Sequence, residues 1–418
     1  MTQPSTGTSP EPCCRFCGAP LTVTFVDLGM SPLSNAYVPP ERVREMEPFY
    51  PLHARVCGSC FLVQLEEFAS PQSIFGEYAY FSSYSETWLE HARHFAAGIV
   101  ARLGLGPASL VLEVASNDGY LLQHVQRLGI PVLGIEPAAN VAAAALAKGI
   151  PTETVFFGTE TARRLVGEDR TADLIVANNV LAHVPDLNDF VAGMALVLKR
   201  SGTITVEFPH LLRLMAEGQF DTIYHEHFSY FSLLTATRVL ARHGLEVHDV
   251  EELSTHGGSL RLYARHAGLG LGPVDGRVAA LLERERSEGL DRLDRYLGFE
   301  TKVQKVKRDL LRFLIEAREG GKRVAGYGAP AKGNTLLNYC GIRTDLLAYT
   351  VDRNPVKQGT LLPGTRIPVR DPARLRCDRP DFLLVLPWNL IEEIVDQHRY
   401  IREWGGRFVV PIPALAVR

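Results

Sequence analysis

Short apolar runs alternate with helical segments in the middle of the chain, between Leu110 and Phe208. The apolar runs have the length of strands, and this succession is typical of a parallel, doubly wound sheet. The predicted strands are Leu110–Ala115, Pro131–Ile135, Thr152–Phe156, Ala172–Ala177 and Thr203–Phe208, with helices over Leu121–Leu128, Ala138–Lys148 and Phe190–Leu198. We therefore predict an α/β fold in which ligands bind at the carboxyl ends of the strands.

The turn after the first predicted strand, Glu113-Val-Ala-Ser-Asn-Asp-Gly119, has one glycine where a dinucleotide-binding turn has three. An acidic residue in the strand, small residues in the turn and Glu136 at the end of the second strand favour S-adenosylmethionine. The carboxylate of Glu136 offers paired acceptors for two ribose hydroxyls. Ala115 and Asn117 replace two glycines of the usual E/D-x-G-x-G pattern, and a plain strand-turn-helix is the alternative. The residues expected to bind the cofactor are Glu113, Ala115, Ser116, Asn117, Asp118, Glu136, Asn178 and Ser83.

The densest group of chemically active side chains is Tyr224-His-Glu-His-Phe-Ser-Tyr230. We expect a loop or a short extended piece, because Leu233–His243 has a helical pattern with Ser232 as its N-cap. In an extended segment His225 and His227 share one side and Glu226 takes the other. A base with orienting partners is favoured. A metal site at the H-x-H spacing is the alternative, although no third ligand stands at a typical distance.

Two further segments concentrate polar side chains. Asn178 to Asp186 follows the fourth predicted strand and contains two amides and His183, which favours a functional site, with capping by Asp186 as the alternative. The segment Tyr78-Ala-Tyr-Phe-Ser-Ser-Tyr-Ser85 is either a polar loop or a lid that brings tyrosine hydroxyls to the reacting centre.

Five of the seven cysteines lie in the first 60 residues, and four of them form the C-x-x-C pairs Cys14–Cys17 and Cys57–Cys60. This spacing brings two thiolates onto one ion, so two pairs predict a closed, structural zinc site in a domain over residues 1–75. Cys13 is the spare cysteine. Redox pairs or coincidence are the alternatives, and Cys340 and Cys377 are expected in the core.

A third domain is predicted over residues 276–418, after a middle domain over 76–275. One or two helices in Gly276–Glu319 precede the strands Lys322–Gly326, Leu346–Val351 and Asp381–Leu386. The turn Tyr327-Gly-Ala-Pro-Ala-Lys-Gly-Asn334 leads into a helix and has the outline of an anion cradle. It lacks the full G-x-G-x-x-G, so a nucleotide pyrophosphate is favoured over NAD in a small Rossmann-like unit. The residues expected to bind the substrate are Gly328, Lys332, Asn334 and Asp352.

The 44 basic and 47 acidic residues of the 418 are intermixed and leave a net charge of -3, which argues against a nucleic-acid surface. No apolar run approaches the roughly 20 residues of a membrane span. Met1–Pro12 has neither the basic nor the apolar region of a signal peptide. We therefore expect a cytoplasmic protein that acts on small molecules, as a monomer or weak oligomer.

These motifs together resemble the nucleotide-sugar C-methyltransferases, in the same order along essentially the whole chain. The resemblance rests on the C-x-x-C pairs, Y-A-Y-F-S-S-Y-S, E-V-A-S-N-D-G, N-N-V-x-A-H-V-P, Y-H-E-H-F-S-Y, T-H-G-G-S-L-R and G-Y-G-A-P-A-K-G-N-T. It implies a zinc-binding N-terminal domain, a class I S-adenosylmethionine-dependent methyltransferase core and a C-terminal domain that helps to hold a TDP-linked 4-keto-deoxysugar of an antibiotic pathway. It also implies that His227 is the base, with Tyr224, Glu226, Tyr78 and His183 at the other active-site positions.

The chemistry of such a reaction requires a base that titrates near neutrality, because a proton next to a ketone is removed before the carbon can attack a methyl group. Donors near the developing oxyanion are also needed, and Tyr224 or Tyr78 suits that role. C-3 is the expected site of methylation. Methylation at C-5 or of another ketone is the nearer alternative, and an NAD-dependent nucleotide-sugar oxidoreductase or a non-enzymatic zinc and nucleotide sensor are the more distant ones.

Overall fold

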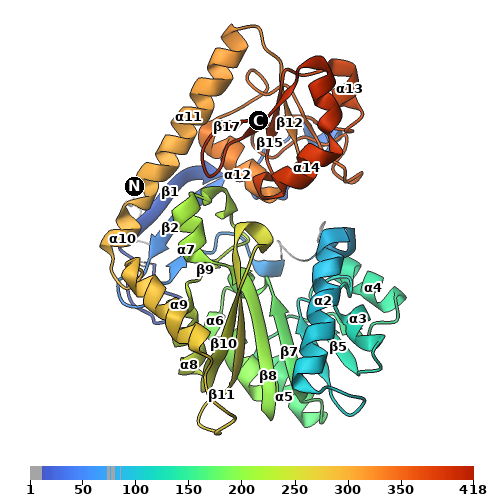
Figure 1. Ribbon diagram of the computed structural model, residues 1–418, viewed down its shortest axis with the longest axis vertical. Coiled ribbons are helices and arrows are strands. Elements are labelled where there is room, and N and C mark those ends of the chain that lie inside the picture. Colours follow the sequence, from blue (N-terminus) through green and yellow to red (C-terminus); the bar gives the residue numbers. More distant parts are fainter. Residues whose placement is uncertain (1–11, 73–75, 77–80, 85) are drawn as a thin grey trace, which may run out of the picture.

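The computed structural model describes residues 12–72, 76, 81–84 and 86–418 (Figure 1). Its largest sheet has seven strands in the order β10-β11-β8-β7-β4-β5-β6. The strands are β4 (Val111–Val114), β5 (Val132–Ile135), β6 (Thr152–Glu153), β7 (Ala172–Asn178), β8 (Leu198–Pro209), β10 (Leu245–Leu253) and β11 (Ser259–His266). The strands from β6 to β8 are parallel, as predicted, and β11 and β10 extend the sheet with antiparallel pairing.

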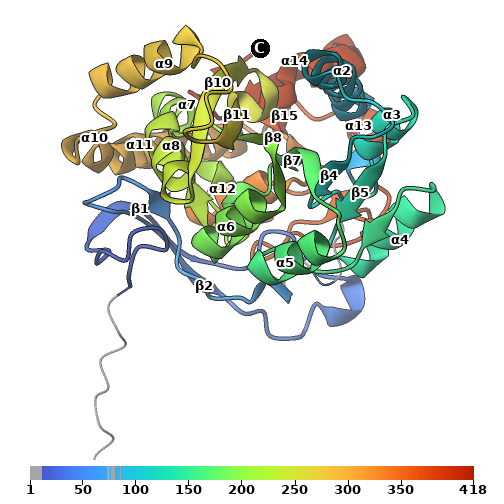
Figure 2. The same cartoon turned by 90° about the horizontal axis from the view of Figure 1, so that it is seen from below.

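Helices cover both faces of this sheet (Figure 2). Successive side chains of β4 enter opposite cores: Val111 packs with α2 and α3, whereas Leu112 and Val114 pack with α5, α6 and α8. These helices are α2 (Glu86–Leu103), α3 (Leu122–Gln126), α5 (Thr159–Gly167), α6 (Leu187–Val197) and α8 (Leu233–Arg242), and α4 (Ala139–Ala147) follows β5. The strand order reverses at β4, so the ligand crevice is expected outside the carboxyl ends of β4 and its neighbours.

The N-terminal sheet is antiparallel, with the strand order β1-β2-β3-β9. Three of its strands come from the first part of the chain, β1 (Val23–Ser31), β2 (Tyr50–Val56) and β3 (Val63–Gln64). The fourth, β9 (Ser229–Tyr230), comes from the histidine-rich segment of the middle part, and pairs Tyr230 with Val63 and Ser229 with Gln64. The candidate catalytic segment is therefore bound to the edge of the N-terminal sheet.

The C-terminal sheet has the order β14-β13-β12-β15-β16-β17 and is parallel except for β17. Three helices precede it instead of the one or two expected: α9 (Gly276–Ser287), α10 (Asp294–Leu297) and α11 (Phe299–Glu319). The strands are β12 (Val324–Tyr327), β13 (Thr350–Val351), β14 (Val369–Arg370), β15 (Phe382–Val385), β16 (Arg407–Val410) and β17 (Ala416–Val417), and the helices α12 (Ala331–Cys340), α13 (Arg374–Asp378) and α14 (Ile391–Gln397) complete this part. Along the described ranges, no helix combines the length and apolarity that crossing a bilayer requires.

Candidate active site

The histidine-rich segment is a turn between two fixed ends. After helix α7 (Leu211–Glu217), a short 3-10 helix over Phe220–Thr222 leads into the turn, which the N–H of His227 closes on the carbonyl of Tyr224 at 2.8 Å. Of the two forms expected, a loop or a short extended piece, Tyr224–His227 takes the loop. His225 therefore does not share a side with His227: its Nε2 lies 3.2 Å from the carbonyl oxygen of Pro51, and its ring faces Tyr50.

His227 has the geometry of a neutral base. Its Nδ1 lies 2.8 Å from the carbonyl oxygen of Thr222. A carbonyl can only accept, so Nδ1 carries the proton and Nε2 keeps a free electron pair. Burial, together with nearby His183, lowers the pKa of His227 well below its usual value. The ring is therefore uncharged at neutral pH with Nε2 open to a proton, although its pKa lies below the near-neutral range expected of the base.

Three other predicted residues lie around His227. The ring centroids of Tyr224 and His183 are 4.1 and 4.6 Å from that of His227. Burial lowers the pKa of His183 to about 4, against a hydrogen bond to the backbone of Glu226. The Glu226 side chain is buried and accepts a hydrogen bond from Nδ2 of Asn35 at 2.6 Å. Tyr78, the remaining predicted catalytic residue, lies outside the described residues.

The turn after β4 adopts the backbone that the usual glycines would allow. Ala115 and Asn117 have φ of 57° and 50°, and Gly119 has 74°. Left-handed φ costs an alanine about 1 kcal/mol or more, and asparagine tolerates it better. The substitutions at Ala115 and Asn117 therefore keep the shape of a cofactor turn, although they add side chains to it.

Glu136 fixes this turn from the end of β5. One carboxylate oxygen accepts the N–H of Asn117 and the other that of Ala138, both at 2.9 Å. Burial raises the pKa of Glu136, and these two bonds oppose that shift. Each oxygen keeps a further acceptor position, which leaves the predicted ribose contact open.

Buried polar atoms without partners gather around the same turn. Buried polar groups are normally hydrogen-bonded, so such a group points to a ligand. Four buried side-chain atoms near the turn form no hydrogen bond with any described residue: Oε2 of Glu113, Oγ of Ser116, Oδ1 of Asp118 and Oδ1 of Asn178. Burial also raises the pKa of Glu113 well above its usual value. The ammonium and hydroxyl groups of S-adenosylmethionine fit this set of acceptors.

Ser83 has a different position from the other predicted cofactor residues. Its hydroxyl accepts from Nζ of Lys148, which also binds the Asp118 carboxylate at 2.9 Å. The neighbouring N–H of Ser82 donates to Oδ1 of Asn117 at 2.8 Å. The short stretch 82–84 is thus fastened to the cofactor turn.

The four cysteines predicted to bind zinc come together. The sulfur atoms of Cys14, Cys17, Cys57 and Cys60 all lie within 4.8 Å of one another. A tetrahedral zinc site with Zn–S bonds of about 2.3 Å requires sulfur atoms about 3.8 Å apart, and the sulfurs of Cys14 and Cys60 are 3.6 Å apart. The N-terminal fold therefore fits a four-thiolate zinc ion. Cys13 is not in the group, and along the described ranges the histidine segment forms no such cluster.

The predicted anion cradle is the glycine-rich loop over residues 327–334, and hydrogen bonds with neighbouring segments hold it in shape. Gly328 has φ of 85°, and a Cβ there would approach Cδ of Pro387 to 2.6 Å. Asp352 accepts the N–H of Ala329 at 2.7 Å, and Nδ2 of Asn334 donates to the carbonyl of Ser34 at 2.6 Å. Lys332 Nζ donates to Oδ1 of Asn389 at 2.8 Å.

The position of Lys332 connects the cradle with the catalytic turn. Its Nζ lies 4.7 Å from the ring centre of Trp388, whose indole N–H donates to the buried carboxylate of Asp221 at 2.7 Å. Burial lowers the pKa of Lys332, and Asp221 opposes that shift. Lys332 in turn contributes to the low pKa of His227.

The sequence reasoning missed three residues of this site: Asn35, Asp221 and His256. His256 has a left-handed φ of 55°. Its ring lies 5.2 Å from that of Trp88, and burial lowers its pKa to about 4. The sequence signal that could have identified His256 is the motif T-H-G-G-S-L-R, because two glycines after a histidine indicate an unusual turn. Asp186, by contrast, caps α6 through the N–H of Asp189 at 3.0 Å, which confirms the structural alternative.

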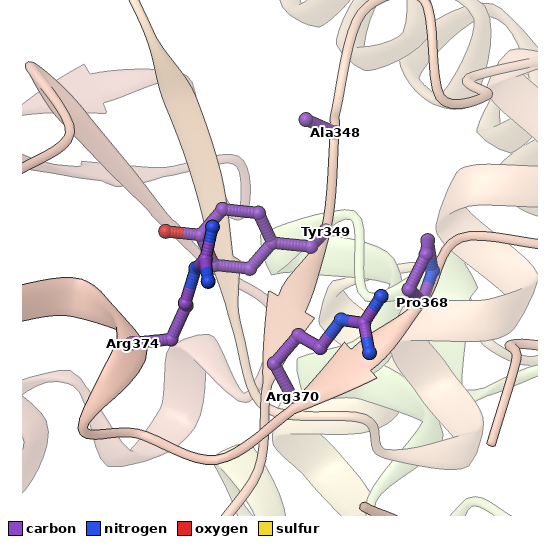
Figure 3. A pocket seen from close by; sticks show the side chains of 5 residues that line it. All are labelled: Ala348, Tyr349, Pro368, Arg370 and Arg374. Carbon is purple, nitrogen blue, oxygen red and sulfur yellow. The ribbon is translucent and has the colours of Figure 1, made fainter. Parts of the chain in front are cut away.

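A hollow in the C-terminal part of the chain shares no residue with this site. It has a volume of about 320 Å³ and is lined by residues of the C-terminal part of the chain, among them Tyr349, Arg370 of β14 and Arg374 of α13 (Figure 3). Tyr349 and Pro368 come immediately before β13 and β14, so the hollow lies at the amino ends of these strands. The predicted cradle, at the carboxyl end of β12, is a separate feature.

The fold, the cofactor turn and the thiolate group define the class: an S-adenosylmethionine-dependent C-methyltransferase with a zinc-binding domain. Family models agree: residues 14–75 match a zinc binding domain, 88–250 a methyltransferase domain and 254–413 a C-methyltransferase C-terminal domain. The chain is 36% identical to the C-methyltransferase NovU of Streptomyces niveus over 400 residues, which cover 96% of this chain and 95% of that protein. It belongs to this family, which confirms the predicted fold class, enzyme class and cofactors.

Other similarities are confined to parts of the chain. A ubiquinone biosynthesis O-methyltransferase of Bartonella tribocorum is 30% identical over 97 residues, 23% of this chain and 39% of that protein. The solved PH0226 protein of Pyrococcus horikoshii is 16% identical and covers 48% of this chain and 99% of its own, with a TM-score of 0.37.

Proposed function

We propose that this C-methyltransferase methylates C-3 of a TDP-linked 4-keto-deoxysugar, with His227 as the base that forms the enolate. The observation that carries the proposal is the uncharged imidazole of His227, with its proton held on Nδ1 by the Thr222 carbonyl. A C–H bond beside a ketone is the one that such a base can break, because the enolate spreads its charge onto oxygen. Similarity to the C-methyltransferase NovU supports a carbon atom as the methyl acceptor.

Each residue of the cluster has a role in this scheme. Nε2 of His227 takes the proton from carbon, and the Nδ1–H bond to Thr222 keeps the ring in place while it becomes charged. The hydroxyl of Tyr224 or that of Tyr78 donates to the developing oxyanion. Glu226 and His183 complete the cluster. When bound at the turn 113–119, S-adenosylmethionine supplies the methyl group that bonds to the carbon.

The nucleotide part of the substrate is assigned to the loop after β12. Asn334 and Asp352 shape the loop through their hydrogen bonds, Gly328 permits its close approach to Pro387, and Lys332 supplies positive charge. We assign zinc binding to residues 1–75, methyl transfer to residues 76–275 and nucleotide binding to residues 276–418.

Substitution of the base tests the mechanism. His227→Asn is expected to reduce methylation at least 100-fold, and to abolish deuterium uptake from solvent at C-3. Mass spectrometry of the sugar measures both. His225→Asn is the matched control from the same turn, since that ring faces Tyr50, and it should retain exchange. Exchange that survives His227→Asn would assign the base to another residue.

The substrate class has its own test. Calorimetry should detect S-adenosylmethionine and TDP, and should give no heat with NAD, which an oxidoreductase would bind. A panel of TDP-4-keto sugars analysed by mass spectrometry then identifies the carbon methylated. A methyl group at C-5 would correct the position and leave the reaction class intact.

A further inference from the structure

The N-terminal part of the chain reaches into the candidate active site through Asn35. This residue lies in the connection between β1 and β2, between the two cysteine pairs of the thiolate group in sequence. Its Nδ2 donates to Oε1 of Glu226 at 2.6 Å, and Glu226 is only 4% exposed. A buried carboxylate depends strongly on its hydrogen-bond donors, because burial disfavours its charge.

The segment around Asn35, residues 34–38, is held by the C-terminal part of the chain. Its Ser34 carbonyl accepts from Nδ2 of Asn334 at 2.6 Å, and the hydroxyl of Tyr37 donates to the carbonyl of Ala329. The N–H groups of Val38 and Leu361 donate to each other's carbonyls, at 2.9 and 2.8 Å. Residues 34–38 thus connect Glu226 with the glycine-rich loop.

We propose that Asn35 is a positioning residue of the active site, whose amide orients the Glu226 carboxylate through the hydrogen bond to its Oε1. The inference rests on the proposed function insofar as it treats Glu226 as part of the catalytic cluster. An amide is neutral, so it can donate to the carboxylate at any pH. The side-chain NH₂ group offers two N–H donors, one of which the Glu226 carboxylate accepts.

Other titratable groups face Glu226 and bear on its charge. Tyr37, whose pKa burial raises, interacts with Glu226 and with Lys357. Lys357 Nζ lies 5.1 Å from the Tyr37 ring and donates to the Ala329 carbonyl at 2.8 Å. On the other side, His183 bonds to the backbone of Glu226 and is uncharged near neutrality, since its pKa is about 4.

The decisive variant is Asn35→Asp, which replaces the donor by a second carboxyl group. Two carboxylates at this distance cannot both ionise, so one keeps a proton to a higher pH. Methylation by Asn35→Asp should therefore be lost at pH 8 and recover at least about 10-fold at pH 6, where a shared proton restores the bond. Protonation of His227 does not remove the activity between pH 8 and pH 6, because burial lowers the pKa of His227 well below its usual value. Asn35→Ala should lower kcat about 10- to 100-fold at both pH values, with little change in KM.

A substrate-free measurement separates this inference from the proposed function. Titration of the Glu226 carboxyl by carbon-13 NMR, assigned with Glu226→Gln, should show its pKa raised in Asn35→Asp. Asn338→Asp is the matched control, since Nδ2 of Asn338 donates to the carbonyls of Asn334 and Pro363 in the same part of the molecule. An unchanged Glu226 pKa in Asn35→Asp, or in Asn35→Ala if Asn35→Asp does not fold, would overturn the inference. A raised pKa in an enzyme that methylates no TDP-sugar would support it and refute the proposed substrate.

Discussion

At the scale of single residues, the site depends on side chains in conformations that their residue types disfavour. Ala115 has φ of 57° in the cofactor turn and His256 has φ of 55° beside Trp88. Such backbone is retained where the surrounding structure imposes it, and it concentrates at functional sites. Both positions lie next to groups that the proposed reaction uses, which makes their substitutions informative.

Ala115 provides a stability prediction. Ala115→Val should lower the free energy of unfolding by about 2 kcal/mol, because a β-branched side chain is a poor occupant of left-handed backbone. Ala115→Gly should change it by less than about 1 kcal/mol, since relief of strain offsets the greater freedom of the unfolded chain. Urea titration measures both. Equal effects of valine and glycine would mean that the backbone at this position is not left-handed.

His256 provides a pH prediction. In the folded protein its pKa is about 4, whereas an unfolded histidine titrates near 6.5. The unfolded chain alone therefore gains this proton between those values, so stability is full above pH 6.5 and falls as the pH drops toward 4. From pH 7 to pH 5 the native protein should lose about 1–2 kcal/mol more than His256→Gln, whose amide does not titrate. If urea titrations showed the same loss of unfolding free energy between pH 7 and pH 5 in the unsubstituted protein and in His256→Gln, the low pKa of His256 would be contradicted.

At the scale of elements, the zinc-binding sheet holds the catalytic segment. Gln64 of β3 donates from Nε2 to the sulfur of Cys14 at 3.2 Å and pairs with Ser229 of β9. The N–H of Leu65 donates to the carbonyl of Phe228 at 3.0 Å. Ser229 is two residues from His227. The pairing of β3 with β9 therefore connects the thiolate group with the candidate base.

Removal of the zinc ion should therefore loosen the catalytic segment first. After chelation, hydrogen exchange in a peptide over residues 224–232 should accelerate at least about 10-fold, since β3 and β9 lose the support of the thiolate group. A peptide from β11 (Ser259–His266), which pairs with β10 and β8 in the large sheet, is the internal control and should keep its protection. Equal acceleration in both peptides would show global unfolding instead of this local coupling.

Local patterns were enough to predict the parallel strands of the large sheet and the thiolate group, but not the antiparallel strands or the contacts between distant segments. The strand at Leu110–Ala115 and the N-cap of α8 at Ser232 follow from short-range sequence signals, and the Ser232 side chain does accept from the N–H of Thr235. Asn35 and Glu226 are 191 residues apart. No periodicity or spacing relates two such positions, because only the pairing of β9 with the N-terminal sheet brings them together.

At the scale of the whole molecule, the zinc-binding sheet and the C-terminal part share one core. Phe25 of β1 stacks on Phe299 of α11 with ring centroids 4.5 Å apart, and the same cluster of buried side chains includes Leu336 of α12 and Leu384 of β15 (Figure 1). A shared core makes the two parts unfold together. Their union also explains how residues 34–38 keep a fixed position between Glu226 and the glycine-rich loop.

Phe299→Ala tests this shared core, because Phe299 is 3% exposed and its ring fills the space against Phe25. We expect a loss of about 3–5 kcal/mol in the free energy of unfolding, from the lost burial and the cavity left behind. Urea unfolding followed by tryptophan fluorescence, which reports on Trp388 and Trp404 as well as on Trp88 of α2, should then shift together with zinc release measured by a chromophoric chelator. Ile315→Ala is the control on the same helix, since its side chain is 45% exposed. Zinc release at unchanged urea concentration, with only the tryptophan signal displaced, would mean that the zinc-binding sheet is stable without the C-terminal part.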